Sequence, residues 1–178
     1  KGTDNRGKIP DTTPICERPA GAENRSRYGH WESDTVLGMR KTGCFGTHVE
    51  RKSGYLVAFR IDDRQDNAFN HATIKAFSSI PEKLKKSFTV DNGKEFAAHK
   101  ALAQATGMKV FFCDPYSPWQ RGTNENTNGL LRQFFPKGTS FANVSDDDLQ
   151  RVVDLINNRP RKRLNFLTPF EVLQKFFL

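Results

Sequence analysis

The segment His-Trp-Glu-Ser-Asp-Thr-Val-Leu (residues 30–37) has the pattern of an extended strand and carries the acidic residue Asp34 near its centre. A strand sends successive side chains to opposite faces, so Glu32, Asp34 and Val36 share one face. A carboxylate among apolar neighbours is costly to bury unless a counter-charge or a metal ion balances it. The segment therefore predicts a strand that carries Asp34 as a candidate metal ligand. The alternative is a half-exposed strand with its acids in water.

Two further acidic residues stand at positions typical of metal ligands. Asp91 follows a short apolar run and precedes Asn-Gly, so it marks either a site at a strand end or an ordinary turn. Glu125 lies in a helical run, with 33 residues between it and Asp91. This spacing, after a longer one from Asp34, is typical of polynucleotidyl transferases, in which three carboxylates hold two metal ions. Oxygen ligands favour Mg²⁺ or Mn²⁺ over zinc.

The helical run around Glu125 carries a polar stripe. At about 100° per residue, Arg121, Asn128 and Arg132 lie within roughly 60° of Glu125. The residues expected to pack on the opposite side are Thr123, Thr127, Leu130, Leu131 and Phe134. A solvated face is the usual reason for such a stripe, but Arg and Asn also suit contacts with phosphates and base edges. Arg121, Asn128 and Arg132 are therefore candidate DNA-binding residues.

Length and composition predict one globular domain with a polyanionic partner. The 178 residues are 36% hydrophobic and 27% charged, which is enough for a sizeable core. The net charge of +8 favours nucleic acid, although a basic surface without a ligand is an even alternative. No apolar run approaches the roughly 20 residues that span a bilayer, so no membrane partner is expected.

The cysteines and histidines show no metal-binding pattern. Cys16, Cys44 and Cys113 are odd in number and widely spaced. They support neither a zinc site nor a disulfide scaffold, and a reducing cytoplasm fits them. The four histidines have no ligand spacing, so we expect ordinary surface or strand residues.

The pattern of apolar residues changes at Tyr28. Residues 1–27 contain no aromatic side chain and few large aliphatic ones, so we expect a linker or an arm that lies on the surface. The chain begins with Lys rather than Met, which suggests a fragment of a longer protein. Residues 28–178 are expected to form the folded core.

The core is expected to be an α/β fold with a mixed five-stranded sheet flanked by helices. The expected strands are 30–37, 43–51, 55–61, 87–90 and 109–113, and the second and third form a hairpin. The expected helices are 67–79, 94–106, 123–135, 146–157 and a short one that begins near Thr168. Chemistry in such sheets collects at strand ends, where Asp91 lies.

Five segments together resemble the DDE transposases of the retroviral-integrase superfamily and, more narrowly, the insertion sequence thirty family. The longest and most specific segment starts at Asp114 with Asp-Pro-Tyr-Ser-Pro-Trp-Gln-Arg-Gly-Thr-Asn-Glu and ends at Gly138. The others are residues 29–36, 49–55, 89–96 and 157–164. The likeness runs from about Tyr28 to the end of the chain.

The resemblance implies an RNase H-like integrase or transposase catalytic core over residues 28–178. It implies that Asp34, Asp91 and Glu125 are the DDE residues that hold two Mg²⁺ or Mn²⁺ ions. Family members usually have Gly where Ser33 stands, and Ser is also small. They also carry an N-terminal helix-turn-helix region that nothing in this chain matches.

The implied function is metal-dependent DNA cleavage at the ends of a mobile element and transfer of the freed 3′-OH into target DNA. The implied partners are both DNAs and further copies of the chain, as a homodimer or a higher oligomer. The implied location is the bacterial cytoplasm, in association with the nucleoid. The alternatives are an RNase H-type nuclease or resolvase without strand transfer, and an inactive DNA-binding module.

Several other residues are weaker candidates. The densest basic cluster is Arg159, Arg161, Lys162 and Arg163, for which phosphate contact is favoured over a solvated surface. Trp119 either stacks on a base or packs under its loop. Helix dipole and loop order explain Glu95 and Asp114 better than a metal does. The remaining acidic cluster, expected to be a solvated loop, is Asp62, Asp63 and Asp66.

Overall fold

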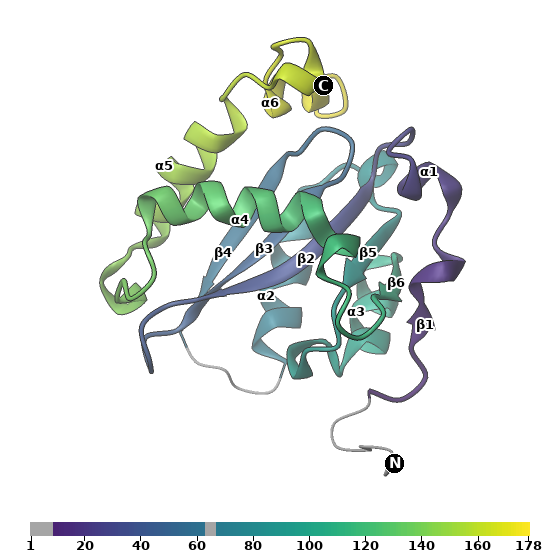
Figure 1. The fold of residues 1–178 in the computed structure, drawn as a ribbon, viewed down its shortest axis with the longest axis horizontal. Coiled ribbons are helices and arrows are strands. Elements are labelled where there is room, and N and C mark those ends of the chain that lie inside the picture. The colour runs from purple at the N-terminus through teal and green to yellow at the C-terminus, as the bar shows by residue number, and fades with distance from the viewer. Residues whose placement is uncertain (1–8, 63–66) are drawn as a thin grey trace.

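The fold is built on one six-stranded sheet with the order β1-β6-β5-β2-β3-β4 (Figure 1). The computed structural model describes residues 9–62 and 67–178. β2, β3 and β4 are antiparallel, whereas β5, β6 and β1 continue the sheet in parallel with β2. The strands are β1 (Thr13–Pro14), β2 (His30–Leu37), β3 (Cys44–Glu50), β4 (Leu56–Ile61), β5 (Ser87–Val90) and β6 (Lys109–Phe112).

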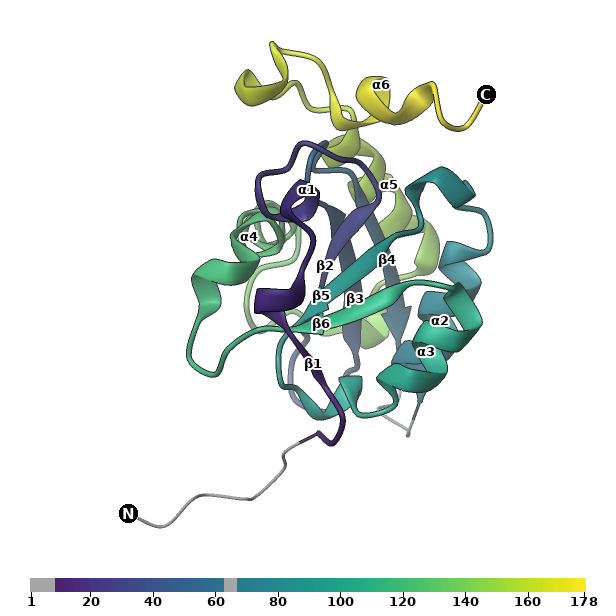
Figure 2. The ribbon, with the colours of Figure 1, turned by 90° about the vertical axis from the view of Figure 1, so that its right-hand side faces the viewer.

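Helices cover both faces of the sheet. Figure 2 shows α2 and α3 on one side and α4 on the other. The α-helices are α1 (Ala20–Glu23), α2 (Ala68–Phe77), α3 (His99–Thr106), α4 (Gly122–Phe134), α5 (Asp146–Asn157) and α6 (Pro169–Gln174). Short 3₁₀ helices lie at 15–17, 82–84, 94–96, 118–121, 141–143 and 162–164. Among the helices that the structure describes, none has the length and apolar composition needed to cross a bilayer.

Each face of the sheet has its own hydrophobic core. Toward α2 and α3, the ring of Trp31 packs edge-on against Phe77, and Phe77 packs against Phe88. Toward α4 and α5, Val36 packs with Leu131. Trp31 and Val36 therefore confirm the alternation predicted for the first strand of the core.

The prediction of five strands was wrong by one. The sixth strand, β1, comes from the segment before Tyr28 and pairs with Phe111 and Phe112 of β6. An edge strand offers unpaired backbone groups, and an extended segment that can bury side chains pairs with them. Ile15 and Ala22 provide that burial. The described part of this segment therefore lies against the sheet.

The packed face of α4 differs from the prediction at its C-terminal end. Thr123, Thr127 and Leu131 are buried as predicted, but Phe134 is 45% exposed. Helical geometry ends at Phe134, and Phe135 has φ −123° and ψ 78°. This bend turns Phe135 into the core in place of its neighbour.

His48 is a fully buried strand histidine. Its ring contacts several Phe rings, including Phe59 and Phe88. Nδ1 is 2.7 Å from the Ser33 hydroxyl, and Nε2 is 3.0 Å from the Thr73 hydroxyl. Burial lowers the pKa of His48 to about 3. Burial, together with nearby cations, lowers the pKa of His30 to about 4.

These two histidines predict an acid-sensitive fold. Both are neutral in the native state down to about pH 4, whereas an unfolded histidine binds a proton below about pH 6.5. Their contribution to stability is therefore complete above pH 6.5 and is lost as the pH falls toward 4. Each should remove about 1.4 kcal/mol of unfolding free energy per pH unit in that window. Urea denaturation at several pH values measures the slope.

His48→Gln should reduce this slope by about half, whatever its effect on stability at pH 7. His71→Gln is the matched control, because His71 is exposed on α2. A slope that is the same in the His48 variant and in the wild type would show that His48 is protonated in the native state.

Candidate active site

The sheet places two of the three predicted carboxylates side by side. β2 pairs in parallel with β5, and Glu32 lies opposite Thr89. Asp34 and Asp91 each lie two residues further along, Asp34 inside β2 and Asp91 directly after β5. α4, which carries Glu125, passes over β2 and β3 on this side of the sheet (Figure 1). The predicted site therefore lies where β5 ends beside α4.

Arg121 joins the two aspartates. Its Nη1 is 3.2 Å from Oδ1 of Asp34, and its Nη2 is 2.9 Å from Oδ2 of Asp91. Nη1 also donates to the carbonyl oxygen of Ser33 at 3.1 Å. Burial opposes the charge of the guanidinium, but the two carboxylates outweigh it and raise the pKa of Arg121. One cation thus holds together two carboxylates that would otherwise repel each other.

Asp34 receives two further hydrogen bonds. The side-chain amide of Asn128 donates to Oδ2 at 3.1 Å, and the backbone N–H of Thr35 donates to Oδ1 at 2.8 Å. Burial raises the pKa of Asp34, and the charge of Arg121 opposes that effect. Two residues from the predicted polar stripe of α4, Arg121 and Asn128, therefore reach the same carboxylate.

The position of Asp91 fits both predictions made for it, an ordinary turn and a site at a strand end. Oδ1 accepts a hydrogen bond from the backbone N–H of Gly93 at 2.8 Å, as in an ordinary Asx turn. Oδ2 points instead to Arg121. The side chain of Asn92 donates to the carbonyl oxygen of Cys113 at 2.9 Å and so ties the turn to the end of β6. Each oxygen of Asp91 thus has a separate role.

Glu125 is exposed in the first turns of α4. Within residues 9–62 and 67–178, no hydrogen bond or ion pair of its carboxylate is found, and no three potential ligands are grouped closely enough to hold a metal. The structure brings Asp34 and Asp91 together through Arg121. Glu125 lies on α4, and no bond joins it to the two aspartates among the described residues. An exposed glutamate can change rotamer without breaking a contact.

Glu32 fixes α4 on the sheet, a role that was not predicted. Its carboxylate is fully buried and accepts the backbone N–H of Asn124 at 2.7 Å. The side-chain amide of Asn124 donates in turn to the carbonyl oxygen of Glu32 at 2.8 Å. Buried Arg51 forms an ion pair with the same carboxylate. Because Asn124 adjoins Glu125, these bonds determine where Glu125 lies. The sequence signal for Glu32 is its place on the same strand face as Asp34.

Arg132 lies further along α4 and is held by neutral partners. Its Nη2 donates to the carbonyl oxygen of Leu37 at 2.7 Å, and its Nη1 donates to that of Phe135 at 3.3 Å. The guanidinium also lies 5.9 Å from the ring centre of Phe141. These contacts orient the charge without neutralising it. Contact of Arg132 with DNA stays a prediction.

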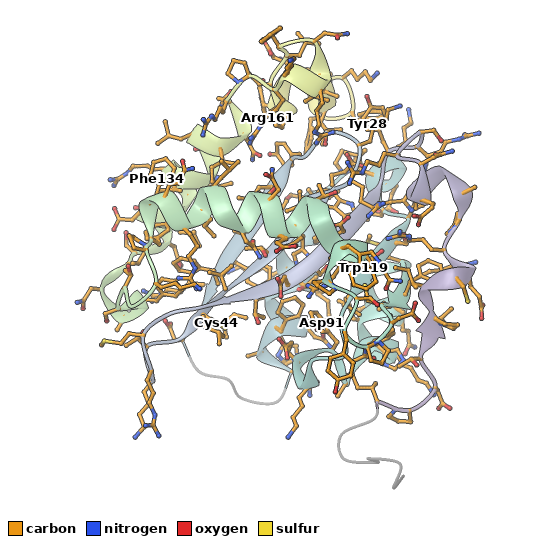
Figure 3. The ribbon with its side chains drawn as sticks, in the orientation of Figure 1. Tyr28, Cys44, Asp91, Trp119, Phe134 and Arg161 are labelled. Carbon is orange, nitrogen blue, oxygen red and sulfur yellow. The ribbon has the colours of Figure 1, made fainter. Side chains whose placement is uncertain are left out.

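Most of the weaker candidates order local structure, whereas Glu95 lies beside Asp91, because both carboxylates approach Gly93. Asp114 pairs with the side chain of Gln120, which confirms its role in loop order. Glu95 accepts the hydroxyl of Thr35 at 2.9 Å. Trp119 is 73% exposed, so it does not pack under its loop (Figure 3). Asp62 forms an ion pair with Arg60, whereas Asp63 and Asp66 lie outside the described residues. No disulfide joins the cysteines Cys16, Cys44 and Cys113.

Comparison with known sequences identifies related transposases. A family model for the integrase core domain matches residues 24–118, which include Asp34 and Asp91 and end before Glu125. The chain is 46% identical over 175 residues to the transposase InsI for insertion sequence element IS30C of Escherichia coli strain K12, covering 98% of this chain and 45% of the relative. It is 43% identical over 173 residues to the transposase for insertion sequence element IS1086 of Cupriavidus metallidurans, covering 97% and 51%. The chain spans about half the length of these curated relatives.

Comparison with solved structures supports the RNase H-like fold. A chain of the simian T-cell lymphotropic virus intasome, solved in complex with PP2A regulatory subunit B56 gamma, superposes with a TM-score of 0.65. The match covers 82% of this chain and 54% of that chain at 19% identity. At this identity the likeness concerns the fold alone.

The buried ion pair predicts a large effect for Glu32→Gln. The variant keeps the size of the side chain but leaves Arg51 without its buried counter-charge. Removal of one partner from a buried pair typically costs about 3–5 kcal/mol of unfolding free energy. Urea denaturation measures the loss.

The control is Arg151→Gln, because Arg151 pairs with Asp148 at the surface of α5. This control should leave the free energy of unfolding unchanged, because an exposed ion pair contributes little. A Glu32→Gln variant as stable as the wild type would contradict the role given to Glu32.

Proposed function

We propose that this chain, which belongs to the integrase core domain family, is the catalytic core of an insertion-sequence transposase. In this proposal it cuts DNA at the ends of a mobile element and joins the freed 3′-OH to target DNA. The observation that carries the proposal is the pair of carboxylates on Asp34 and Asp91, beside the helix that bears Glu125. The similarity to the named transposases supports the same conclusion.

The donor set fits divalent cations of the Mg²⁺ type. Asp34, Asp91 and Glu125 offer only carboxylate oxygens, which hard cations prefer. The positive charge that Arg121 supplies between the two aspartates supports this fit, because it marks a place where a cation is stabilised. Asp34, Asp91 and Glu125 would together hold these ions. The chemistry that such ions supply when bound is activation of the attacking oxygen and stabilisation of the departing 3′-oxygen.

The side chains of the protein have separate tasks in this proposal. Glu125 turns toward the aspartates by a change of rotamer, since its carboxylate has no hydrogen bond or ion pair to break within residues 9–62 and 67–178. Asn128 holds Oδ2 of Asp34 in place. Arg121 exchanges its carboxylate contacts for the phosphate of the cleaved strand, to which a guanidinium can donate two hydrogen bonds. In the first step the oxygen of water forms a bond to phosphorus and the bond to the 3′-oxygen breaks. In the second step the oxygen of that 3′-OH loses its proton and forms a bond to a target phosphorus, while the bond from this phosphorus to the target 3′-oxygen breaks and that oxygen takes up a proton.

The partners proposed are DNA and other copies of the chain. The net charge of +8 supports a polyanionic ligand. Transposition joins two element ends, so a homodimer or a higher oligomer is proposed for the active complex. A bacterial cytoplasmic protein associated with the nucleoid fits this function and the bacterial origin of the relatives.

The proposal predicts that any one of three substitutions abolishes strand cleavage: Asp34→Asn, Asp91→Asn or Glu125→Gln. Each keeps the shape of the side chain and removes a carboxylate charge from the site. Cleavage of an end-labelled element-end duplex in Mg²⁺ or Mn²⁺ is the measurement. The control is Asp154→Asn, an exposed position on α5.

A second assay uses a pre-cut end and an unlabelled target duplex. A transposase joins the two, whereas a nuclease cuts without joining and a DNA-binding module does neither. Normal cleavage by any of the three variants would refute the assignment of that carboxylate.

A further prediction concerns Arg121→Gln and metal affinity. The substitution removes the cation that shares Asp34 and Asp91, so Mn²⁺ should bind about tenfold more tightly or better. Calorimetric titration of Mn²⁺ without DNA measures this directly. Arg132→Gln is the control, because Arg132 bonds to backbone carbonyls instead. Equal or weaker Mn²⁺ binding by Arg121→Gln would mean that Arg121 does not compete for the site.

A further inference from the structure

A cleft of ≈ 510 Å³ lies on the flank of α4 away from the carboxylates. It is bounded by α4, by the β3–β4 turn at Gly54 and by the segment that follows α5. In Figure 3, Asp91 lies on one side of α4 and Arg161 on the other. The cationic residues that line the cleft are Arg25, Arg159, Arg161, Lys162 and Arg163.

The charge of this cleft is not balanced from within. No Asp or Glu is among the lining residues that the structure describes, and no ion pair of the described chain involves the five cations. Burial and the neighbouring Arg159 and Arg163 lower the pKa of Arg161. Burial and Arg25 lower that of Arg163, with Glu50 opposing. Partly desolvated cations that repel one another are stabilised by an anion.

Two of these guanidinium groups are held in place by neutral acceptors. Arg163 donates through Nη1 to the carbonyl oxygen of Lys52 at 2.7 Å. Arg161 donates through Nη2 to the carbonyl oxygen of Ile156 at 3.1 Å. These bonds fix the direction of each group but leave its charge and its remaining N–H donors available.

Thr123 provides an independent sign of a ligand in the cleft. Thr123 is among the residues that line the cleft and is 7% exposed, and its hydroxyl oxygen is buried and has no hydrogen-bond partner in the described chain. A buried hydroxyl without a partner is unfavourable unless a ligand or water satisfies it. Thr123 lies in the first turn of α4, a helix of 13 residues whose N-cap side chain makes no capping bond.

The surface of α4 between Glu125 and the cleft is accessible to a ligand at its two glycines. With Glu125 at 0°, helical geometry places Gly129 at about 40°, Gly122 at about 60° and Thr123 at about 160°. A Cβ built on Gly122 or Gly129 would meet nothing within 4 Å. A ligand can therefore come close to the helix backbone beside Gly122 and Gly129, between the carboxylates and the cleft.

We propose that this cleft holds backbone phosphates of a DNA strand that crosses the N-terminal half of α4 from the active site. The Thr123 hydroxyl and the cations donate to phosphate oxygens, so the contact is independent of base sequence. This inference rests on the proposed function, because the same strand would be cut at the carboxylates.

The test compares two cleft variants with matched controls in fluorescence anisotropy with an element-end duplex. Thr123→Val removes the unpartnered hydroxyl without a change in charge, so it should weaken DNA binding about tenfold while leaving the melting temperature equal or higher. Its control is Thr127→Val, whose hydroxyl already donates to the carbonyl oxygen of Thr123 within the helix. That control should bind DNA as the wild type does.

The second cleft variant is the double substitution Arg159→Gln and Lys162→Gln. It should weaken binding and reduce the slope of log K against log salt by about 0.9 per lost phosphate contact. Its control, Lys100→Gln with Arg151→Gln, removes the same charge elsewhere on the surface. Cleft variants that bind like their controls would overturn the inference.

Cleavage by the wild-type chain separates this inference from the proposed function. If the wild type cuts DNA in Mg²⁺ and the cleft variants bind like their controls, the inference alone fails. If the cleft variants lose affinity but the wild type never cuts DNA, the proposed function fails and the phosphate site stands. If the wild type binds no DNA at all, both fail.

Discussion

The buried carboxylate of Glu32 is the constraint on which the rest of the site depends. A charged group at full burial is unfavourable by several kcal/mol unless partners surround it. Glu32 has two, the Arg51 guanidinium and the backbone N–H of Asn124. The second of these fixes the first turn of α4 against the centre of the sheet. A helix held there carries Glu125 on the side of the sheet where Asp34 lies, two residues along the strand from Glu32.

The position of α4 determines two surfaces at once. One flank carries Asn128, and Arg121 directly precedes the helix on the same side, so that both reach the carboxylate of Asp34. The other carries Thr123, which faces a cleft lined by cations. A DNA strand, which is negatively charged, is therefore attracted to one side of the helix and meets acidic residues on the other. Divalent cations would reverse the local charge on the acidic side, so that both flanks favour phosphate.

The sequence was sufficient for much of the fold because its signals are local. Alternation in residues 30–37 predicted which side chains of β2 face each core, and Trp31 and Val36 confirm it. The two-residue strand β1 was missed because its pairing depends on the free edge of β6, far away in the chain. Phe134 was misplaced because helix periodicity does not show where α4 ends and Phe135 turns inward.

For the candidate site, the sequence predicted the three carboxylates but not the partners that hold them. Spacing and the resemblance together pointed to Asp34, Asp91 and Glu125, and the structure puts the two aspartates within reach of one arginine. The partner of Glu32 could not be predicted, because Asn124 lies 92 residues from it in the chain. The bridging role of Arg121 likewise required the parallel pairing of β2 with β5. Long-range contacts of this kind carry no local pattern.

The most direct test of the central claim is the location of Mn²⁺ by anomalous diffraction from crystals of this chain soaked in the metal. The account predicts density roughly 2.0–2.3 Å from carboxylate oxygens of both Asp34 and Asp91, with Arg121 withdrawn from them and Glu125 turned toward the metal. Density elsewhere on the protein, or aspartates still bridged by Arg121 at saturating Mn²⁺, would contradict it.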